Sequence, residues 1–186
     1  SRLVAVGGSK SQNPIAGSAV VITSDDGGTT WVRRPVASAF NLRRVAWNGS
    51  QYVAVGWTGT IVTSPDGVTW SFQQKLTLDL WDVVWAGDRF VAVGNDAVLV
   101  SSDGGSTWTT GGAETRSLHG LAWTGSQLVA TGSWGTVGVV RTSDDRGTTW
   151  QEVYRDSSTL TLSDSAWTGQ EIFIVGDLGV IERGEC

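Results

Sequence analysis

The residues best suited to ligand binding are tryptophans that stand outside the regular pattern of the sequence. The chain has 186 residues and eleven tryptophans, most of which recur at a fixed spacing. Three do not recur: Trp57, Trp81 and Trp134. An indole ring stacks on the apolar face of a ligand and donates one hydrogen bond. Tryptophans that a repeat does not explain are therefore candidates for a binding surface.

Polar and charged residues occupy repeat positions close to these rings. One position, just before a short apolar run, varies between repeats beside an unvarying leucine, and it contains Arg43, Trp81, His119 and Ser163. Aromatic rings beside charged and amide groups suit a sugar, whose hydroxyls need planar hydrogen-bonding partners, or a loop of another protein. The candidate ligand-binding residues are Trp57, Trp81, Trp134, Arg43, His119, Asn95, Asp96 and Asp177.

Two other readings of these residues stay open. The exposed tryptophans could cap a hydrophobic channel or cover an interface with a second chain. His119 could be an ordinary hydrogen-bonded loop residue, and Arg43 and Arg44 could pair with Asp82 of the next repeat rather than with an anion.

The elements that position these residues are repeats of about 40 residues, the length of a four-stranded propeller blade. Two sets of tryptophans mark the period. One set follows a turn that contains aspartate: Trp31, Trp70, Trp108 and Trp150. The other set ends a short apolar strand: Trp47, Trp85, Trp123 and Trp167. Short strands at regular spacing, with turn residues between them and no helical period, predict an all-β protein.

Each repeat is expected to contain four strands, of which the first is innermost. First strands are predicted at Arg44–Trp47, Asp82–Trp85, Gly120–Trp123 and Asp164–Trp167. Second strands are predicted at Leu3–Val6, Tyr52–Val55, Phe90–Val93, Leu128–Thr131 and Ile172–Val175. Third strands are predicted near Ala19–Thr23, Ile61–Thr63, Val98–Ser101, Val139–Thr142 and Val180–Arg183, and fourth strands start at the first set of tryptophans.

These strands predict one β-propeller domain over residues 1–186, with about five four-stranded units. The unit boundaries are expected near 1–38, 39–76, 77–113, 114–158 and 159–186. The chain opens on a second strand and stops after a third, so both terminal units are incomplete. Either five units close with two incomplete blades, or a homodimer completes the ring, or the chain is an excerpt of a longer propeller.

Antiparallel strands place successive turns on alternate faces of the propeller. The turns after second strands and the loops between units share one face, which carries Trp57, Trp81 and Trp134. The long segment Ser9–Ser18 joins the same face, and such loops often carry specificity. The aspartate turns share the opposite face.

The aspartate turns follow a common pattern, S-x-D-x-G-x-T-W. Segments 24–31, 101–108 and 143–150 fit it, and 64–70 is one residue shorter. Asp and Ser side chains accept hydrogen bonds from a tight turn, Gly supplies a positive φ, and Trp packs across the turn. Their residues are therefore read as structural, not catalytic or calcium-binding: Asp26, Trp31, Asp66, Trp70, Asp103, Trp108, Asp145 and Trp150.

This pattern resembles the Asp box, the repeat of bacterial neuraminidases that also occurs in sortilin-type, xyloglucanase-type and photosystem-assembly-factor-type propellers. The resemblance implies a β-propeller with the boxes on the far side from the binding site, and it favours a secreted or periplasmic protein. Sialidase chemistry, as the family implies it, needs three arginines, a Tyr–Glu pair and an acidic Asp. Only Tyr52 and Tyr154 exist here, Tyr52 stands at a core position, and the usual Arg-Ile-Pro region is missing.

Composition excludes several classes of function. A formal charge of −5 and a pI near 4.7 argue against a nucleic-acid partner, which needs a basic face. No apolar run is long enough to insert into a membrane, and Ser1 is consistent with a processed or engineered end. The single cysteine, Cys186, allows no intrachain disulfide. No motif for a metal, a phosphate-bearing cofactor or a nucleophilic serine is present.

Three functions compete on this sequence. The first is a non-catalytic module that binds a glycan or a protein loop on the face of Trp57, Trp81 and Trp134. The second is a structural or assembly-factor propeller that binds polypeptide. The third is a glycoside hydrolase, which needs paired acids. Asp82 and Asp164 stand at equivalent positions, but we expect their side chains to point away from Arg43 and Trp81, so no catalytic residue and no cofactor are assigned.

Overall fold

The computed structural model describes residues 2–8, 18–36, 40–74, 76–112, 116–155, 160–177 and 181–185, the last range by its backbone alone. Most of the predicted specificity loop Ser9–Ser18, the position Val180 and the terminal Cys186 lie outside the described residues. Among the residues described, no helix combines the length and apolar character needed to cross a membrane.

The described strands form five antiparallel sheets, which confirms the predicted all-β fold class. The first sheet contains β1 (Leu3–Gly8), β2 (Ala19–Ser24) and β3 (Val32–Arg34). The second contains β4 (Leu42–Trp47), β5 (Tyr52–Gly56), β6 (Ile61–Ser64) and β7 (Ser71–Gln74). The third contains β8 (Leu80–Trp85), β9 (Phe90–Gly94), β10 (Ala97–Ser101) and β11 (Thr109–Thr110).

The last two sheets repeat the arrangement. The fourth contains β12 (Ser117–Trp123), β13 (Leu128–Trp134), β14 (Val137–Ser143) and β15 (Gln151–Arg155). The fifth contains β16 (Leu162–Trp167), β17 (Glu171–Gly176) and β18 (Ile181–Glu185). A short 3₁₀ turn, η2 (Trp57–Gly59), follows β5. The terminal sheets have three described strands each, as the opening and closing strands of the sequence predict.

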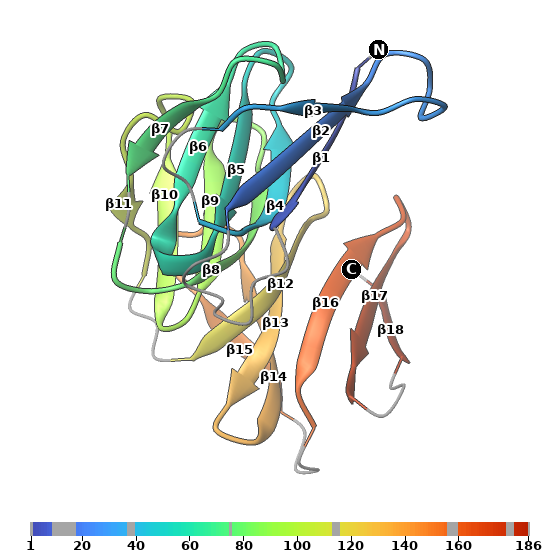
Figure 1. Ribbon diagram of the computed structural model, residues 1–186. Helices are drawn as coiled ribbons and strands as arrows, with labels where there is room; N and C mark the ends of the chain where they lie inside the picture. The colour runs from blue at the N-terminus through green and yellow to red at the C-terminus, as the bar shows by residue number, and fades with distance from the viewer. Residues whose placement is uncertain are drawn as a thin grey trace.

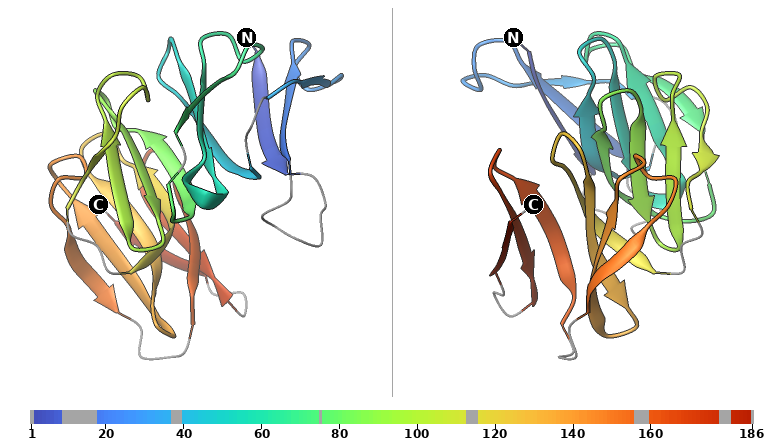
Figure 2. Two further views of the ribbon diagram at one scale, coloured as in Figure 1. Left: turned by 60° about the vertical axis from the view of Figure 1, so that its left-hand side comes forward. Right: turned by 180° about the vertical axis from the view of Figure 1, so that it is seen from behind.

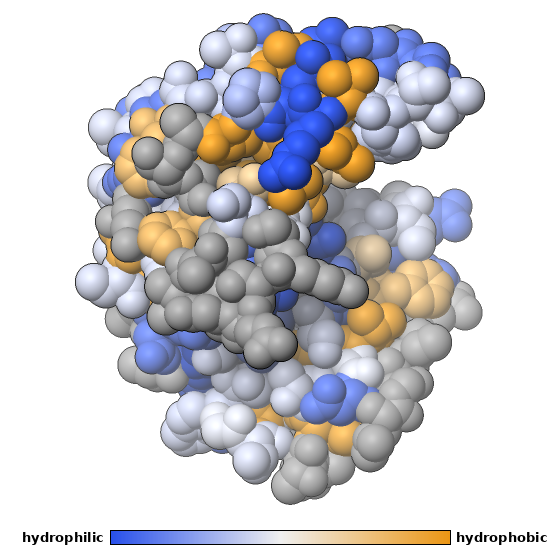
Figure 3. Space-filling model, viewed as in Figure 1, coloured by the Kyte–Doolittle hydropathy of each residue, from blue (hydrophilic) through white to orange (hydrophobic). Residues whose placement is uncertain are grey.

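The five sheets follow one another around an arc that is open on one side (Figure 1). Strand β4 packs against β1 and β8, and β12 packs between β8 and β16. The first strands β4, β8, β12 and β16 line the inside of the arc. Views from other directions also separate β1–β3 from β16–β18 (Figure 2). The space-filling surface is hollowed between the two (Figure 3). The exact unit boundaries, the single domain, and a second copy that closes the ring stay predictions.

The hydrophobic core lies between neighbouring sheets. Between the second and third sheets, Val53 and Ile61 pack with Leu80, Val83 and Phe90, all nearly inaccessible to solvent. Similar clusters lie between each other pair of adjacent sheets. Because a strand buried on both faces needs apolar side chains at successive positions, the second strand of each central sheet reads as a continuous apolar run.

The first strands begin earlier than predicted, because each contains a β-bulge. The register shifts at Leu42/Arg44, Leu80/Asp82, Leu118/Gly120 and Leu162/Asp164. The predicted starts lie one residue after each bulged residue. Opposite the bulge stands a recurrent glycine, for example Gly94, where a Cβ atom would collide with the carbonyl of Asp79. The glycine leaves the bulged backbone room to approach its partner strand.

The Asp boxes build closed turns at one end of the sheets. In the first, Asp26 Oδ1 accepts hydrogen bonds from Ser24 Oγ at 2.7 Å and from Thr30 N at 2.9 Å, and Trp31 Nε1 donates to the carbonyl of Gly28 at 3.0 Å. Hydrogen bonds from Thr30 lower the pKa of Asp26 to about 2. The boxes of Asp66, Asp103 and Asp145 repeat this arrangement. These carboxylates hold the turns by accepting hydrogen bonds from the turn backbone.

Candidate functional site

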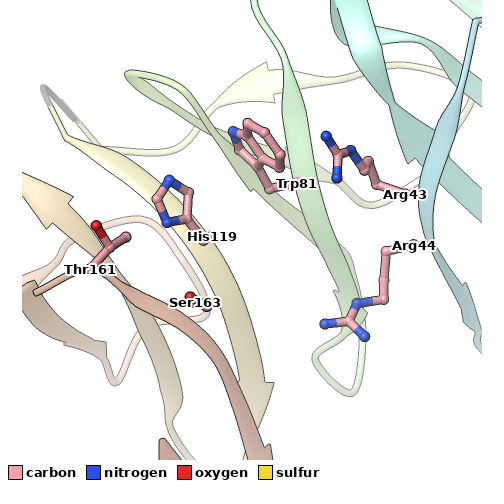
Figure 4. A pocket seen from close by; sticks show the side chains of 6 residues that line it. All are labelled: Arg43, Arg44, Trp81, His119, Thr161 and Ser163. Atoms are coloured by element: carbon pink, nitrogen blue, oxygen red, sulfur yellow. The ribbon is translucent and has the colours of Figure 1, made fainter. Parts of the chain in front are cut away.

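The four bulges point their extra residues into one pocket. The bulged residues are Arg43, Trp81, His119 and Ser163. All four line a pocket of about 480 Å³, together with Arg44 and Thr161 (Figure 4). A bulge turns a side chain away from the regular alternation of its strand. The variable positions of the sequence are thus gathered by a backbone feature that every complete sheet and the fifth sheet share.

Arg43 lies against two indole rings. Its guanidinium carbon is 4.3 Å from the ring centroid of Trp81 and 5.0 Å from that of Trp57. The two indole centroids are 6.0 Å apart. His119 meets Trp81 edge to face, with centroids 5.5 Å apart. Cation–π contacts and tilted stacking therefore order Trp57, Arg43, Trp81 and His119 into one row.

Hydrogen bonds from second-strand turns fix this row. Trp81 Nε1 donates to Asn95 Oδ1 at 2.7 Å, and Asp79 Oδ1 accepts from the backbone N–H of Thr58 at 2.7 Å. Thr58 has a positive φ of 53°, so the bond to Asp79 stabilises an uncommon backbone conformation beside Trp57. Asp79 and Asn95 act as positioning residues through these Oδ1 atoms.

The remaining predicted residues are placed differently. Asp177 Oδ2 accepts a hydrogen bond from the backbone N–H of Thr161 at 3.1 Å, which ties the turn after β17 to the pocket rim. Asp96, exposed and with a φ of 51°, forms the tight turn between β9 and β10. Each of these residues shapes a turn on the predicted face, and neither lines the pocket.

Trp134 belongs to a separate cluster. Its ring is 50% exposed and lies 4.4 Å from the guanidinium of Arg155 and 5.3 Å from that of Arg116. Both arginines form salt bridges with Glu152, at 2.6 Å and 3.1 Å. The structure brings Trp57 and Trp81 together around Arg43 and sets Trp134 apart from the pocket that Trp81 lines.

An ion cluster is centred on Arg44, which lines the pocket; Asp82 is its one buried side chain, whereas Arg44 and Asp164 are each 42% exposed. Arg44, on β4, reaches Asp82 on β8, where Nε and Oδ1 are 2.9 Å apart, and Asp164 on β16, where Nη2 and Oδ2 are 2.8 Å apart. Asp82 Oδ2 also accepts from the backbone N–H of Leu121 at 2.8 Å. Of the two arginines that could pair with Asp82, Arg44 does so, and within the described residues Arg43 does not. The two acids meet a guanidinium, and so they do not face each other across open space as a hydrolytic pair would.

Burial governs the ionisation of the site. Desolvation raises the pKa of Asp82 to about 6, even though Arg44 favours its charged form. Burial lowers the pKa of Arg43, and it lowers that of His119, whose Nδ1 lies 3.4 Å from the carbonyl oxygen of Leu162. The pocket is thus lined by a partly buried arginine and by a histidine whose lowered pKa favours the neutral form.

Sequence reasoning missed two residues at this site, Thr161 and Asp79. Thr161 precedes the fifth inner strand and is found only through the pocket geometry. Asp79 stands one residue before the recurrent leucine, and nothing in its spacing singles it out. For Arg44 the sequence suggests an ion pair with Asp82. Its second ion pair, with Asp164, joins β4 to β16, which are far apart in the sequence. Among the described residues, no group of acids and histidines is arranged to bind a metal ion.

Comparison with known proteins establishes the fold. No family model and no curated protein matches the chain. Among solved structures, it resembles YCF48 bound to a D1 peptide, with a TM-score of 0.69, 20% identity, and coverage of 90% of this chain and 57% of that one. It also resembles YCF48 from Cyanidioschyzon merolae, with a TM-score of 0.66, 20% identity, and coverage of 89% and 60%.

These likenesses show that the sheets form the arc of an Asp-box β-propeller, as the repeats predict. The chain spans less than two thirds of the length of either YCF48 structure.

Proposed function

We propose that this chain is a polypeptide-binding propeller module, and that the ligand occupies the pocket lined by Arg43, Trp81, His119 and Ser163. The observation that carries the proposal is the bulge shared by four inner strands. It directs the side chains that vary between repeats into one hollow, above a framework that the repeats keep constant. A constant scaffold with one variable ring is the organisation expected of a binding surface.

Charge indicates which kind of polypeptide fits. Within the described part of the chain, Arg43 has no carboxylate at ion-pair distance. The next residue, Arg44, is paired with Asp82 and Asp164. The indoles of Trp57 and Trp81 hold the Arg43 guanidinium in place, and partial burial strengthens its attraction for an anion. A carboxylate of the ligand, on a side chain or at a chain end, therefore suits Arg43, while the neighbouring rings suit its apolar groups.

Two observations favour a polypeptide over a glycan. Asn95 Oδ1 and Asp177 Oδ2, two of the oxygens expected to bind sugar hydroxyls, accept hydrogen bonds from Trp81 and from the backbone N–H of Thr161. These two acceptors are therefore already occupied by the protein itself. In addition, a propeller of the same fold, YCF48, has been solved with a D1 peptide bound.

The test compares an array of acidic, neutral and basic peptides with a glycan array, using the native protein and two variants. Trp81→Ala removes the centre of the aromatic row. Trp31→Ala, in the first Asp box, is the matched control because it also removes a partly exposed tryptophan, at the opposite end of a sheet. Circular dichroism establishes that both variants are folded.

The proposal predicts binding of acidic peptides that Trp31→Ala retains and Trp81→Ala loses. Arg43→Gln should weaken the same peptides by about tenfold or more, since it removes a charge-assisted contact. Binding of glycans with no binding of peptides would contradict the proposal, and so would peptide binding that Trp81→Ala leaves unchanged.

A further inference from the structure

Strand β1 of the first sheet has a free edge. Among the described strands, β1 pairs only with β2, whereas β5, β9, β13 and β17 each pair with a first strand on one side and a third strand on the other. By sequence β1 is a second strand, because 3–7 reads LVAVG where 52–56 reads YVAVG and 90–94 reads FVAVG. It borders the open side of the arc (Figure 1). Within the described residues, no first strand covers this edge.

A glycine of β1 stands where the other sheets accommodate their bulges. In those four sheets, a Cβ atom on the last glycine of the apolar run would collide with the carbonyl oxygen of the residue that precedes the recurrent leucine. The four glycines are Gly56, Gly94, Gly132 and Gly176. Gly7 occupies the equivalent position, but a Cβ atom built there meets nothing within 4 Å, and its φ is not positive. Neither packing nor backbone conformation requires a glycine there, whereas an added bulged strand would.

The valines of β1 are less buried than their equivalents. Val4 and Val6 pack on the core cluster shared with the second sheet, but both stay partly exposed. Their equivalents Val53 and Val55 pack on the third sheet and are inaccessible to solvent. A strand on the free edge of β1 would cover this apolar surface, which favours its binding.

The free edge of β1 also lacks the residues that normally protect an edge strand. Charged side chains and proline discourage an edge from pairing with another chain. The outer strands β3 and β15 carry such charges, at Arg33, Arg34, Glu152 and Arg155. Leu3–Gly8 contains neither a charge nor a proline. Its composition is that of a strand paired on both edges.

We propose that the free edge of β1 binds an extended segment of another polypeptide that has the pattern of this chain's own first strands. That pattern begins with leucine, continues with the bulged residue and ends in tryptophan, as in 42–47, LRRVAW, and 118–123, LHGLAW. The segment would run antiparallel to β1, as the first strands run to the second strands. A second copy of this chain is a poor source, because its four described first strands are already paired within their own sheets.

The added strand would continue the inner row of strands and reach the pocket. β4 packs against β8, β8 against β12 and β12 against β16. Because β4 also packs against β1, a strand paired with β1 would lie beside β4 and extend this row. The bulge of each first strand directs one side chain into the pocket. The bulged residue of the added strand would therefore lie next to Arg43, so that the partner supplies a fifth member of the variable ring.

The experiment is amide hydrogen exchange on ¹⁵N-labelled protein, with and without a capped peptide, NLRRVAWN, which copies 41–48. In an antiparallel pair, alternate residues direct their N–H groups to a given neighbour. We expect alternate amides of Leu3–Gly8 to exchange about tenfold or more slowly when the peptide is bound. A peptide of the same composition and charge in scrambled order, RWNVLANR, should give no such protection.

Two variants locate the binding. Gly7→Ala should fold, because the new methyl group meets no atom in the free protein. It should weaken the peptide by about tenfold or more, because the methyl group would collide with the backbone of a bulged strand. Val32→Ala is the matched control, since Val32 lies on the outer strand of the same sheet and is 50% exposed. This control should leave peptide binding unchanged.

Two further peptides test the position of the bulged residue. NLERVAWN and NLQRVAWN differ only there, and the first places a carboxylate beside Arg43. It should bind about threefold or more tightly than the second. Arg43→Gln should remove this preference while the protection of β1 remains.

Unchanged exchange in β1, equal binding of the scrambled peptide, or binding that Gly7→Ala leaves unaltered would overturn the proposal. A preference for NLERVAWN that persists in Arg43→Gln would refute the placement of the bulged residue. A dimer in sedimentation experiments, with β1 protected before any peptide is added, would assign the edge to a second copy and contradict a separate partner. Because exchange in β1 is the readout, its outcome does not depend on whether the pocket itself binds acidic peptides.

Discussion

The substitution Asp82→Asn should remove a pH dependence from the stability of the protein. Burial raises the pKa of Asp82 from 3.8 to about 6, and its side chain is only 3% exposed. The folded protein therefore binds this proton more tightly than the unfolded chain does. The resulting stabilisation is fully present below pH 3.8 and is lost as the pH rises through about 6.

The size of this effect follows from the two pKa values. At about 1.4 kcal/mol per pKa unit, the difference between 3.8 and about 6 corresponds to about 3 kcal/mol. Most of it, about 2 kcal/mol, develops between about pH 7 and about pH 4. The free energy of unfolding of the native protein should rise by this amount relative to Asp82→Asn when the pH is lowered over that range.

The assay is urea unfolding followed by tryptophan fluorescence at a series of pH values. Asp88→Asn is the control, because a hydrogen bond from Arg89 holds the pKa of Asp88 below its ordinary value, the opposite direction to the shift at Asp82. The native protein and the control should show parallel curves. Parallel curves for the native protein and Asp82→Asn would refute the argument that Asp82 is a buried carboxylate in the folded state.

The remaining predictions concern the framework. Gly94→Ala should destabilise by about 3 kcal/mol or more, because its Cβ would collide with a backbone carbonyl. Gly7→Ala, at the equivalent position of the first sheet, meets no atom and should change the free energy of unfolding by less than about 1 kcal/mol. Trp70→Ala should cost about 3–5 kcal/mol, and Trp31→Ala clearly less, because the side chains are 8% and 43% exposed. Asp26→Asn should flatten the loss of thermal stability between pH 3.8 and about 2, since the stabilisation from this lowered pKa is lost as the pH falls through that range. Chemical and thermal unfolding measure all five variants, and equal effects within either matched pair would contradict the packing argument.

The architecture could be predicted because its signals are local and repeated. Each Asp box is formed by residues within one turn, and each apolar run describes one buried strand. Four copies of the same pattern therefore fix the strand order and the direction of the turns. The same reasoning separated Trp57 and Trp81 from the framework tryptophans, and the structure brings these two rings together beside Arg43.

The parts that could not be predicted depend on how separate sheets meet. The bulge at Trp81 extends its strand upstream, and only the pairing with Gly94 reveals it. Trp134 follows the same sequence logic as Trp57, but its sheet turns it towards Arg155. The cluster of Arg44 with Asp164 joins residues from the second and fifth sheets, and no periodicity within the chain specifies that contact.

The measurement that tests the central proposal most directly is a titration of ¹⁵N-labelled protein with a peptide selected on the array, followed by the indole N–H resonances of its eleven tryptophans. If the pocket of Arg43 binds polypeptide, the resonances of Trp57 and Trp81 should shift together, while those of the Asp-box tryptophans stay in place. Peptide-induced shifts confined to other tryptophans, with Trp57 and Trp81 unmoved, would contradict the assignment of the site.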